Sequence, residues 1–163
     1  MSRIRAVAFD VDGVLTDGTF WWGPDGQEWK RFSFRDVMGV SRALRSGLMV
    51  AMISGEDSPL VDRFAAKMGI EDVFKGAKDK ALALREFARR HALECSEIAF
   101  MGDDVNDLEA MKLSGLAATP ANAEDSVRAI AQFESKYDGG QGAVRELLEH
   151  LIARSVERGN EKV

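Results

Sequence analysis

The sequence has little cysteine, histidine or proline. Its 163 residues include one cysteine, Cys95, two histidines and three prolines. A lone thiol excludes an internal disulfide framework and a thiolate metal cluster, and it is typical of proteins from a reducing compartment. No run of 18 apolar residues occurs and no signal-peptide segment precedes the first predicted strand, so we expect no membrane span and a cytoplasmic protein.

Positive charge is also scarce. Twenty-two Lys and Arg residues face 27 Asp and Glu residues, for a formal charge of -5, and the cations are dispersed along the chain. Nucleic-acid binding needs clustered cations, so no nucleic-acid partner is expected. The hydrophobic share of 45% and charged share of 30% are ordinary for a globular protein. We predict one domain over residues 1–158 and a frayed tail over 159–163.

Short apolar runs alternate with helical patterns. This alternation predicts an α/β fold, a Rossmann-like doubly wound parallel sheet with helices on both faces. Ser58 can cap a helix that begins at Pro59 and that Gly69 ends. The strands are expected at 4–9, 48–53, 98–101 and 116–118, and the other helices at about 79–91, 106–113 and 142–158.

One segment interrupts the alternation. Residues 18–33 read as two strands around the turn Gly23-Pro24-Asp25-Gly26, which predicts a small β-hairpin inserted after the first strand. It carries Trp21, Trp22 and Trp29. These aromatic side chains either cover an edge of the domain or form a subunit interface, where tryptophan is enriched. No other insertion is long enough for a cap domain.

Two carboxylates stand where the first strand ends. Residues 10–17 read Asp-Val-Asp-Gly-Val-Leu-Thr-Asp. Since side chains two positions apart in extended chain point the same way, Asp10 and Asp12 are expected to converge at the carboxyl edge of the sheet. Two negative charges at such a short distance need a shared proton or a bound cation such as Mg²⁺. This pattern points to phosphoryl transfer on Asp10; the alternative is an ordinary Asp/Gly turn that ends a strand.

Further polar groups follow two other predicted strands. Three carboxylates, those of Asp103, Asp104 and Asp107, come after residues 98–101, and Ser54-Gly55 comes after residues 48–53. The hydroxyl of Ser54 and the flexible backbone N–H groups suit phosphate oxygens. Lys80 begins a predicted helix, where a cation is unfavourable to the helix dipole, so we expect it to contact an anion. Lys75 and Lys78 are competing candidates.

The order of these motifs is the signature of a family. The chain resembles the haloacid dehalogenase superfamily of phosphatases over essentially its whole length. The resemblance rests on four motifs in this order: D-x-D-G-V-x-T-D, Ser54, Lys80 and G-D-D-x-x-D. The early hairpin, the absence of a cap, Arg35-Asp36 and the segment 139–146 are similar to the subgroup that hydrolyses phosphorylated 2-keto-3-deoxy sugar acids. Its substrates include octulosonate 8-phosphate and nonulosonate 9-phosphate.

The resemblance implies a role for each motif residue. Asp10 is the expected nucleophile and Asp12 the expected acid and base, with Ser54 and Lys80 on the phosphoryl group. Mg²⁺ would be held by the Asp10 carboxylate, the Asp12 main-chain carbonyl and Asp103. The supporting positions around the metal fall to Asp104 and Asp107.

Substrate binding is expected from Gly55, Glu56 and Arg35, with Arg145 and Lys30 as weaker choices for a substrate carboxylate. Glu56 and Gln141 stand where octulosonate phosphatases usually carry Arg, whereas Arg35-Asp36 is octulosonate-like, so both substrates stay open. The subgroup also implies a homotetramer. The alternatives are a noncatalytic tetramerisation module, like those fused to sialic-acid cytidylyltransferases, or a sugar phosphatase of broader specificity.

Overall fold

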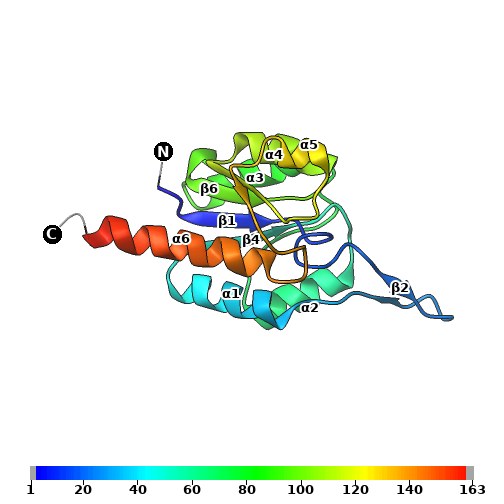
Figure 1. Ribbon diagram of the computed structural model, residues 1–163. Helices are drawn as coiled ribbons and strands as arrows, with labels where there is room; N and C mark the ends of the chain where they lie inside the picture. The colour runs from blue at the N-terminus through cyan, green and yellow to red at the C-terminus, as the bar shows by residue number, and fades with distance from the viewer. Residues whose placement is uncertain (1–2, 161–163) are drawn as a thin grey trace.

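A parallel six-stranded sheet forms the centre of the computed structural model, which describes residues 3–160 (Figure 1). The strand order is β5-β4-β1-β6-β7-β8, so the chain moves from β1 to β4 on one side and to β6 on the other. Ligands bind at such a switch point in open α/β sheets. The strands are β1 Ala6–Phe9, β4 Met49–Ile53, β5 Asp72–Phe74, β6 Ile98–Met101, β7 Leu116–Thr119 and β8 Phe133–Glu134.

Helices cover both faces of the sheet (Figure 1). Alternate residues of β1 enter two hydrophobic cores: Val7 and Phe9 face one, and Ala6 and Ala8 face the other. The predicted doubly wound α/β fold is thereby confirmed. The first core contains residues of α1 Phe34–Arg45, α2 Pro59–Met68 and α6 Ala143–Asn160, and the second contains residues of α3 Lys80–Arg90, α4 Leu108–Leu113 and α5 Asp125–Arg128.

The helix ends follow from local chemistry. Helix α2 begins at Pro59 with the Ser58 hydroxyl accepting the Leu60 N–H, and it ends where Gly69 adopts a φ of +70°. Helix α6 is different, because a residue that is distant in the sequence accepts hydrogen bonds from N–H groups at its N-terminal end. Buried Asp36 in α1 accepts the N–H of Gly142 at 3.2 Å and that of Arg145 at 2.9 Å. This carboxylate therefore fixes α6 against α1.

The predicted strands and helices are present, with small shifts at their ends. Helix α4 begins at Leu108, because residues Val105–Asp107 first form a 3₁₀ turn, η2. The edge strands β5 and β8 were not predicted, since they have only three and two residues and no apolar run. Of the predicted frayed tail, residues 159 and 160 belong to α6, and residues 161–163 lie outside the described part.

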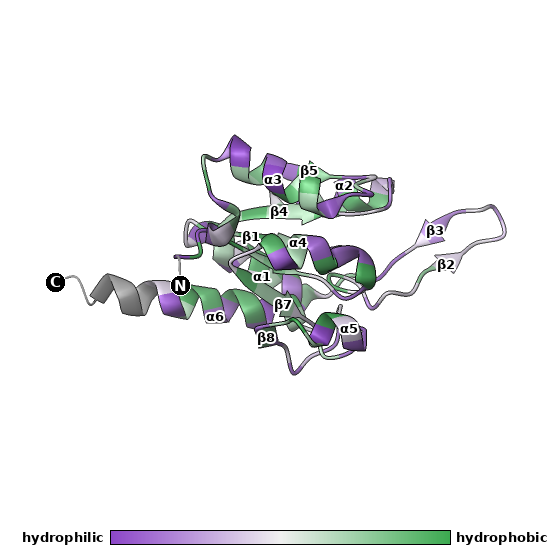
Figure 2. Ribbon diagram, turned by 90° about the horizontal axis from the view of Figure 1, so that it is seen from above, coloured by the Kyte–Doolittle hydropathy of each residue, from purple (hydrophilic) through white to green (hydrophobic). Residues whose placement is uncertain are grey.

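The predicted hairpin projects from the carboxyl edge of the sheet (Figures 1 and 2). Its strands, β2 Trp21–Trp22 and β3 Glu28–Trp29, have two residues each, fewer than predicted, and they pair antiparallel. The aromatic side chains are largely exposed: Trp22 is 70% exposed, and Phe20, Trp21 and Trp29 about half. Among residues 3–160, these side chains are therefore not packed against an edge of the sheet. No helix among residues 3–160 has the length and apolar character to cross a membrane.

Candidate active site

The carboxyl ends of three adjacent strands supply the predicted site residues. Asp10 follows β1, Ser54 follows β4, and Asp103 comes two residues after β6. The strand register continues past the strand ends: the Asp10 N–H donates to the Met101 carbonyl at 3.0 Å, and the Ser54 N–H donates to the Phe74 carbonyl at 2.8 Å. The polar groups are therefore held by the sheet itself rather than by a mobile loop.

Lys80 is the lysine that reaches the carboxylates. Its Nζ lies 2.8 Å from Asp10 Oδ1 and 2.6 Å from Asp107 Oδ1, and all three side chains are buried. Lys75 instead pairs with Asp57 and Asp62, while Lys78 donates to the Gly55 carbonyl. Of the three lysines that the sequence left open, the structure thus brings Lys80 to these carboxylates.

Asp103 has the features of a cation ligand. Carboxylate oxygens of Asp10, Asp103 and Asp107 lie within 4.8 Å of one another. Asp103 Oδ1 is buried and has no hydrogen-bond partner among the described residues. Gly13 approaches so closely that a Cβ there would overlap the Asp103 carboxylate. A buried acceptor without a partner is costly, so this oxygen is suited to a cation.

The electrostatics agree with this geometry. Burial, together with the charge of Asp107, raises the pKa of Asp10 to about 7 despite the opposing effect of Lys80. Burial and the charges of Asp10 and Asp107 raise the pKa of Asp103 to about 8. Burial lowers the pKa of Lys80, but the two carboxylates outweigh it and the net shift is upward. One lysine does not neutralise the cluster, and a hard divalent cation with oxygen ligands such as Mg²⁺ fits it.

Asp107 and Asp104 hold the loop that presents Asp103. Asp107 is completely buried, and its Oδ2 accepts the N–H groups of Asp103 and Asp104 at 3.0 and 3.3 Å, while Oδ1 contacts Lys80. Asp104 Oδ1 accepts the Val105 N–H at the start of η2. With both oxygens occupied, Asp107 is placed to orient its neighbours rather than to approach a substrate.

Asp12 has a partner that the spacing of the motifs did not reveal. Its Oδ1 lies 2.7 Å from the Nζ of Lys30, at the base of the hairpin, and Lys30 also contacts Glu28 at 3.3 Å. The sequence analysis considered Lys30 only for a substrate carboxylate. Because the pair spans the whole hairpin insertion, only the path of the chain could identify it.

A cavity of about 250 Å³ unites most of the predicted residues. Asn106 lines it and was missed, although it stands within the predicted acidic motif. Arg35 does not line it, because its guanidinium lies over the Tyr137 ring, 4.7 Å from the centroid. Ser54 is buried beside it, and its hydroxyl accepts the Glu56 N–H. The lining residues are Asp10, Asp12, Gly18, Gly55, Glu56, Lys80, Asp103, Asp104 and Asn106.

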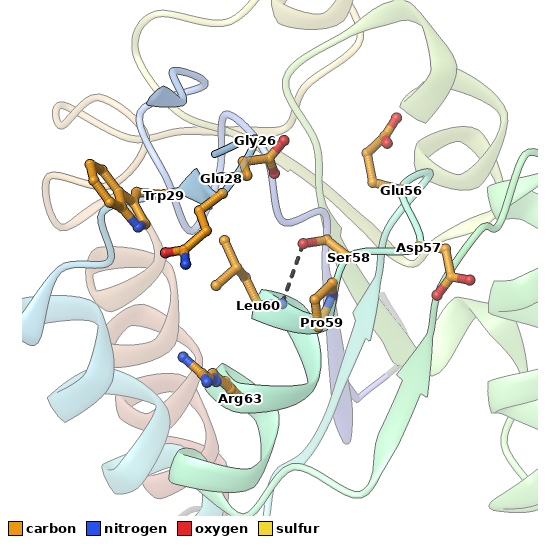
Figure 3. A pocket seen from close by; sticks show the side chains of 10 residues that line it. Gly26, Glu28, Trp29, Glu56, Asp57, Ser58, Pro59, Leu60 and Arg63 are labelled. Atoms are coloured by element: carbon orange, nitrogen blue, oxygen red, sulfur yellow. Dashed lines mark hydrogen bonds between the residues drawn. The ribbon is translucent and has the colours of Figure 1, made fainter. Parts of the chain in front are cut away.

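A larger cavity of about 610 Å³ adjoins the first one between the hairpin and the N-terminal end of α2 (Figure 3). Glu56 lines both cavities. Trp29 and Glu28 come from the hairpin side, and Leu60 and Arg63 come from α2. The smaller cavity is lined mainly by acidic residues, and the larger one, which shares Glu56 with it, has a mixed polar and apolar lining.

Comparison with known proteins agrees with this site. Residues 42–147 match the family of haloacid dehalogenase-like hydrolases. A curated relative, the 3-deoxy-D-manno-octulosonate 8-phosphate phosphatase of Escherichia coli, is 36% identical over 92% of this chain and 80% of its own. The chain belongs to the haloacid dehalogenase-like hydrolases.

Solved structures of phosphatases from this superfamily have the same fold as this chain. The 3-deoxy-D-manno-octulosonate 8-phosphate phosphatase of Moraxella catarrhalis, in complex with a magnesium ion, a phosphate ion and a KDO molecule, superposes with a TM-score of 0.90 at 35% identity, over 93% of this chain and 87% of its own. The cobalt-bound enzyme of Haemophilus influenzae gives 0.89 at 32% identity, over 93% and 88%. The prediction of a phosphatase of this superfamily is confirmed, and the acidic cluster fits the predicted cofactor, Mg²⁺.

Proposed function

We propose that this phosphatase hydrolyses 3-deoxy-D-manno-octulosonate 8-phosphate, a phosphorylated 2-keto-3-deoxy sugar acid, and that residues 1–158 form its single catalytic domain. The observation that carries the proposal is the convergence of Asp10, Asp12, Lys80 and Asp103 on one cavity. The curated relatives from Escherichia coli and Yersinia pestis, which match 92% and 93% of the chain, are named for this substrate. A noncatalytic module is not favoured, because a complete set of carboxylates converges here.

In the proposed reaction, Asp10 attacks phosphorus and the bond to the sugar oxygen breaks, leaving the phosphoryl group on the Asp10 carboxylate. Asp12 donates a proton to the departing oxygen and later takes one from the water that releases phosphate. Lys80 and Ser54 hold the phosphoryl oxygens. When bound to Asp10, Asp103 and the Asp12 carbonyl, Mg²⁺ supplies positive charge that offsets the phosphoryl charge.

The rest of the substrate is proposed to extend past Glu56 into the larger cavity. The volume of that cleft, and its position beside the phosphoryl pocket, support this placement. Arg63 lines the cleft and can pair with the substrate carboxylate. Arg35 keeps the role predicted for it only as a proposal, because it lines neither cavity. Arg63→Ala and Arg35→Ala distinguish the two proposals, because the arginine that pairs with the substrate carboxylate is the one whose replacement raises KM for the sugar acid phosphate.

We further propose a homotetramer that acts in the cytoplasm. The exposed hairpin aromatics Phe20, Trp21, Trp22 and Trp29 support assembly, because such a set is typical of an interface core. A neighbouring copy seated on the hairpin would also cover the open side of the larger cavity. Water would then be excluded from the site without a cap domain.

The test is phosphate release with Mg²⁺ from octulosonate 8-phosphate, nonulosonate 9-phosphate and hexose phosphates, compared by kcat/KM. We expect a strong preference for octulosonate 8-phosphate. Preference for the nonulosonate would reassign the substrate, and Glu56→Arg should then shift the ratio toward the octulosonate. Equal, weak activity on all of them would indicate a phosphatase of broader specificity and would contradict the sugar-acid proposal.

A further inference from the structure

Lys30, at the base of a largely exposed hairpin, has a side chain that is mostly shielded from solvent. Only 5% of its side chain is exposed, whereas Trp29 beside it is 55% exposed. Its ammonium group contacts Asp12 at 2.7 Å and Glu28 at 3.3 Å. Removing a lysine from water is unfavourable unless it is paired, so these two carboxylates account for its position.

For Asp12 the contact is more significant, because its side chain stands on a turn after β1 and remains about one third exposed. Within residues 3–160, Lys30 is the one hydrogen-bonding or charged partner found for the Asp12 carboxylate. Without this contact, no hydrogen bond or ion pair among residues 3–160 would hold the Asp12 carboxylate in place. A general acid has to lie within hydrogen-bond reach of the atom that it protonates.

Lys30 does not itself line the cavity that contains Asp12. It approaches Asp12 from the hairpin, outside the pocket where the phosphoryl group would lie. This placement separates Lys30 from Lys80, which lines the pocket and contacts Asp10. An effect of Lys30 on the phosphoryl pocket therefore passes through Asp12, whereas an effect on the larger cavity would pass through Glu28, which lines it.

We propose that Lys30 is a positioning residue that holds Asp12 in place for proton transfer to the leaving group. The inference rests on the proposed function, in which Asp12 protonates the sugar oxygen as its bond to phosphorus breaks. Glu28 continues the network, since its other oxygen accepts the Trp22 indole N–H at 3.3 Å. The position of Asp12 is thereby connected to the hairpin.

Arg31 offers a matched control. It lies next to Lys30 at the same hairpin base and pairs with Asp17 at 3.0 Å, but its side chain is 57% exposed and touches no predicted catalytic residue. Lys30→Met and Arg31→Met each remove one cation that ties the hairpin to the motif of residues 10–17. Only Lys30→Met frees Asp12.

The first experiment compares kcat/KM for phenyl phosphate and p-nitrophenyl phosphate with Mg²⁺. Phenoxide is the more basic leaving group and needs the proton from Asp12 more. We expect Lys30→Met to lower kcat/KM for phenyl phosphate about tenfold more than for p-nitrophenyl phosphate. Arg31→Met should leave that ratio unchanged. Equal losses on both phosphates in Lys30→Met would show a merely structural role and overturn the proposal, as would a loss confined to the sugar acid phosphate.

A double-mutant cycle with Asp12→Asn gives the second readout, on octulosonate 8-phosphate. If Lys30 acts through Asp12, Lys30→Met lowers kcat/KM in the native background and has no further effect beside Asp12→Asn. Additive losses would overturn the proposal. The milder Lys30→Gln serves if thermal unfolding shows Lys30→Met to be unfolded. If Asp12→Asn loses as much kcat/KM on p-nitrophenyl phosphate as on phenyl phosphate, the proposed role of Asp12 fails. If Asp12→Asn loses more on phenyl phosphate but Lys30→Met loses equally on both, only the Lys30 inference fails.

Discussion

The sheet edge and the hairpin differ in what holds their functional side chains. At the sheet edge, Asp10, Lys80 and Asp107 are buried, and Lys80 forms ion pairs with both carboxylates. The hairpin has two short strands, exposed aromatics and ion pairs at its base. The proposed catalytic residues are thus held by the fold of a single chain, whereas the surface around them depends on a segment that has little packing of its own.

The largest expected effect is the loss of the nucleophile. Asp10→Asn preserves the shape of the buried side chain but cannot form an acyl phosphate, so we expect turnover to fall about 10⁴-fold or more. Phosphate release measures the loss, and circular dichroism and sedimentation serve as controls for fold and assembly. Substantial activity in this variant would refute the assignment of Asp10.

A second variant tests how tightly the sheet edge is packed. Gly13 and Gly26 have φ values of +89° and +80°, but a Cβ at Gly13 would overlap Asp103, whereas one at Gly26 meets nothing within 4 Å. Both alanine variants carry the strain of a left-handed backbone, about 1–2 kcal/mol. We expect only Gly13→Ala to lower the apparent Mg²⁺ affinity in activity titrations, by about 10- to 100-fold. Equal affinities in the two variants would contradict the proposed metal position.

For the hairpin, Trp22→Asp introduces a charge where a second copy is proposed to bind. We expect the tetramer to dissociate in sedimentation velocity and the activity to fall by about tenfold through loss of water exclusion. Leu82→Asp is the control, because Leu82 is a similarly exposed apolar residue (64%) on α3. If Trp22→Asp remains a tetramer, the hairpin is not the interface.

The smallest effect concerns pH. In the metal-free protein the pKa values of Asp10 and Asp103 are raised from 3.8 to about 7 and about 8. From pH 3.8 up to these raised values, the native state therefore binds more protons than the unfolded state. The cluster therefore lowers the free energy of unfolding as the pH rises through that window. Mg²⁺ would offset the repulsion between the ionised carboxylates of Asp10 and Asp103, which is strongest at high pH. It should therefore raise Tm by about 5 °C more at pH ~9 than at pH ~6. Equal shifts at both pH values would contradict this account.

How much could be predicted from the sequence also differs between the two regions. Apolar runs and strand-end carboxylates were sufficient to predict β1, β4 and β6 and the placement of Asp10, Asp12 and Asp103 at one edge of the sheet, because these signals are local. The choice of Lys80 over Lys75 and Lys78, which lie within five residues of it, depended on where α3 begins.

Long-range pairs were out of reach of the sequence. The contact between Lys30 and Asp12 crosses the hairpin, and Asp36 caps α6 from 106 residues away. Such contacts depend on the path of the chain between them. The short edge strands β5 and β8 and the placement of Arg35 on Tyr137 were likewise set by tertiary packing.

The most direct test of the central claim is to trap the phosphorylated protein. Enzyme mixed with Mg²⁺ and labelled octulosonate 8-phosphate, quenched in acid during turnover and digested, should carry one acid-stable, base-labile phosphoryl group on the peptide that contains Asp10. Label at that position would establish Asp10 as the nucleophile at the sheet edge. Turnover without label on Asp10, or label on another residue, would contradict the account.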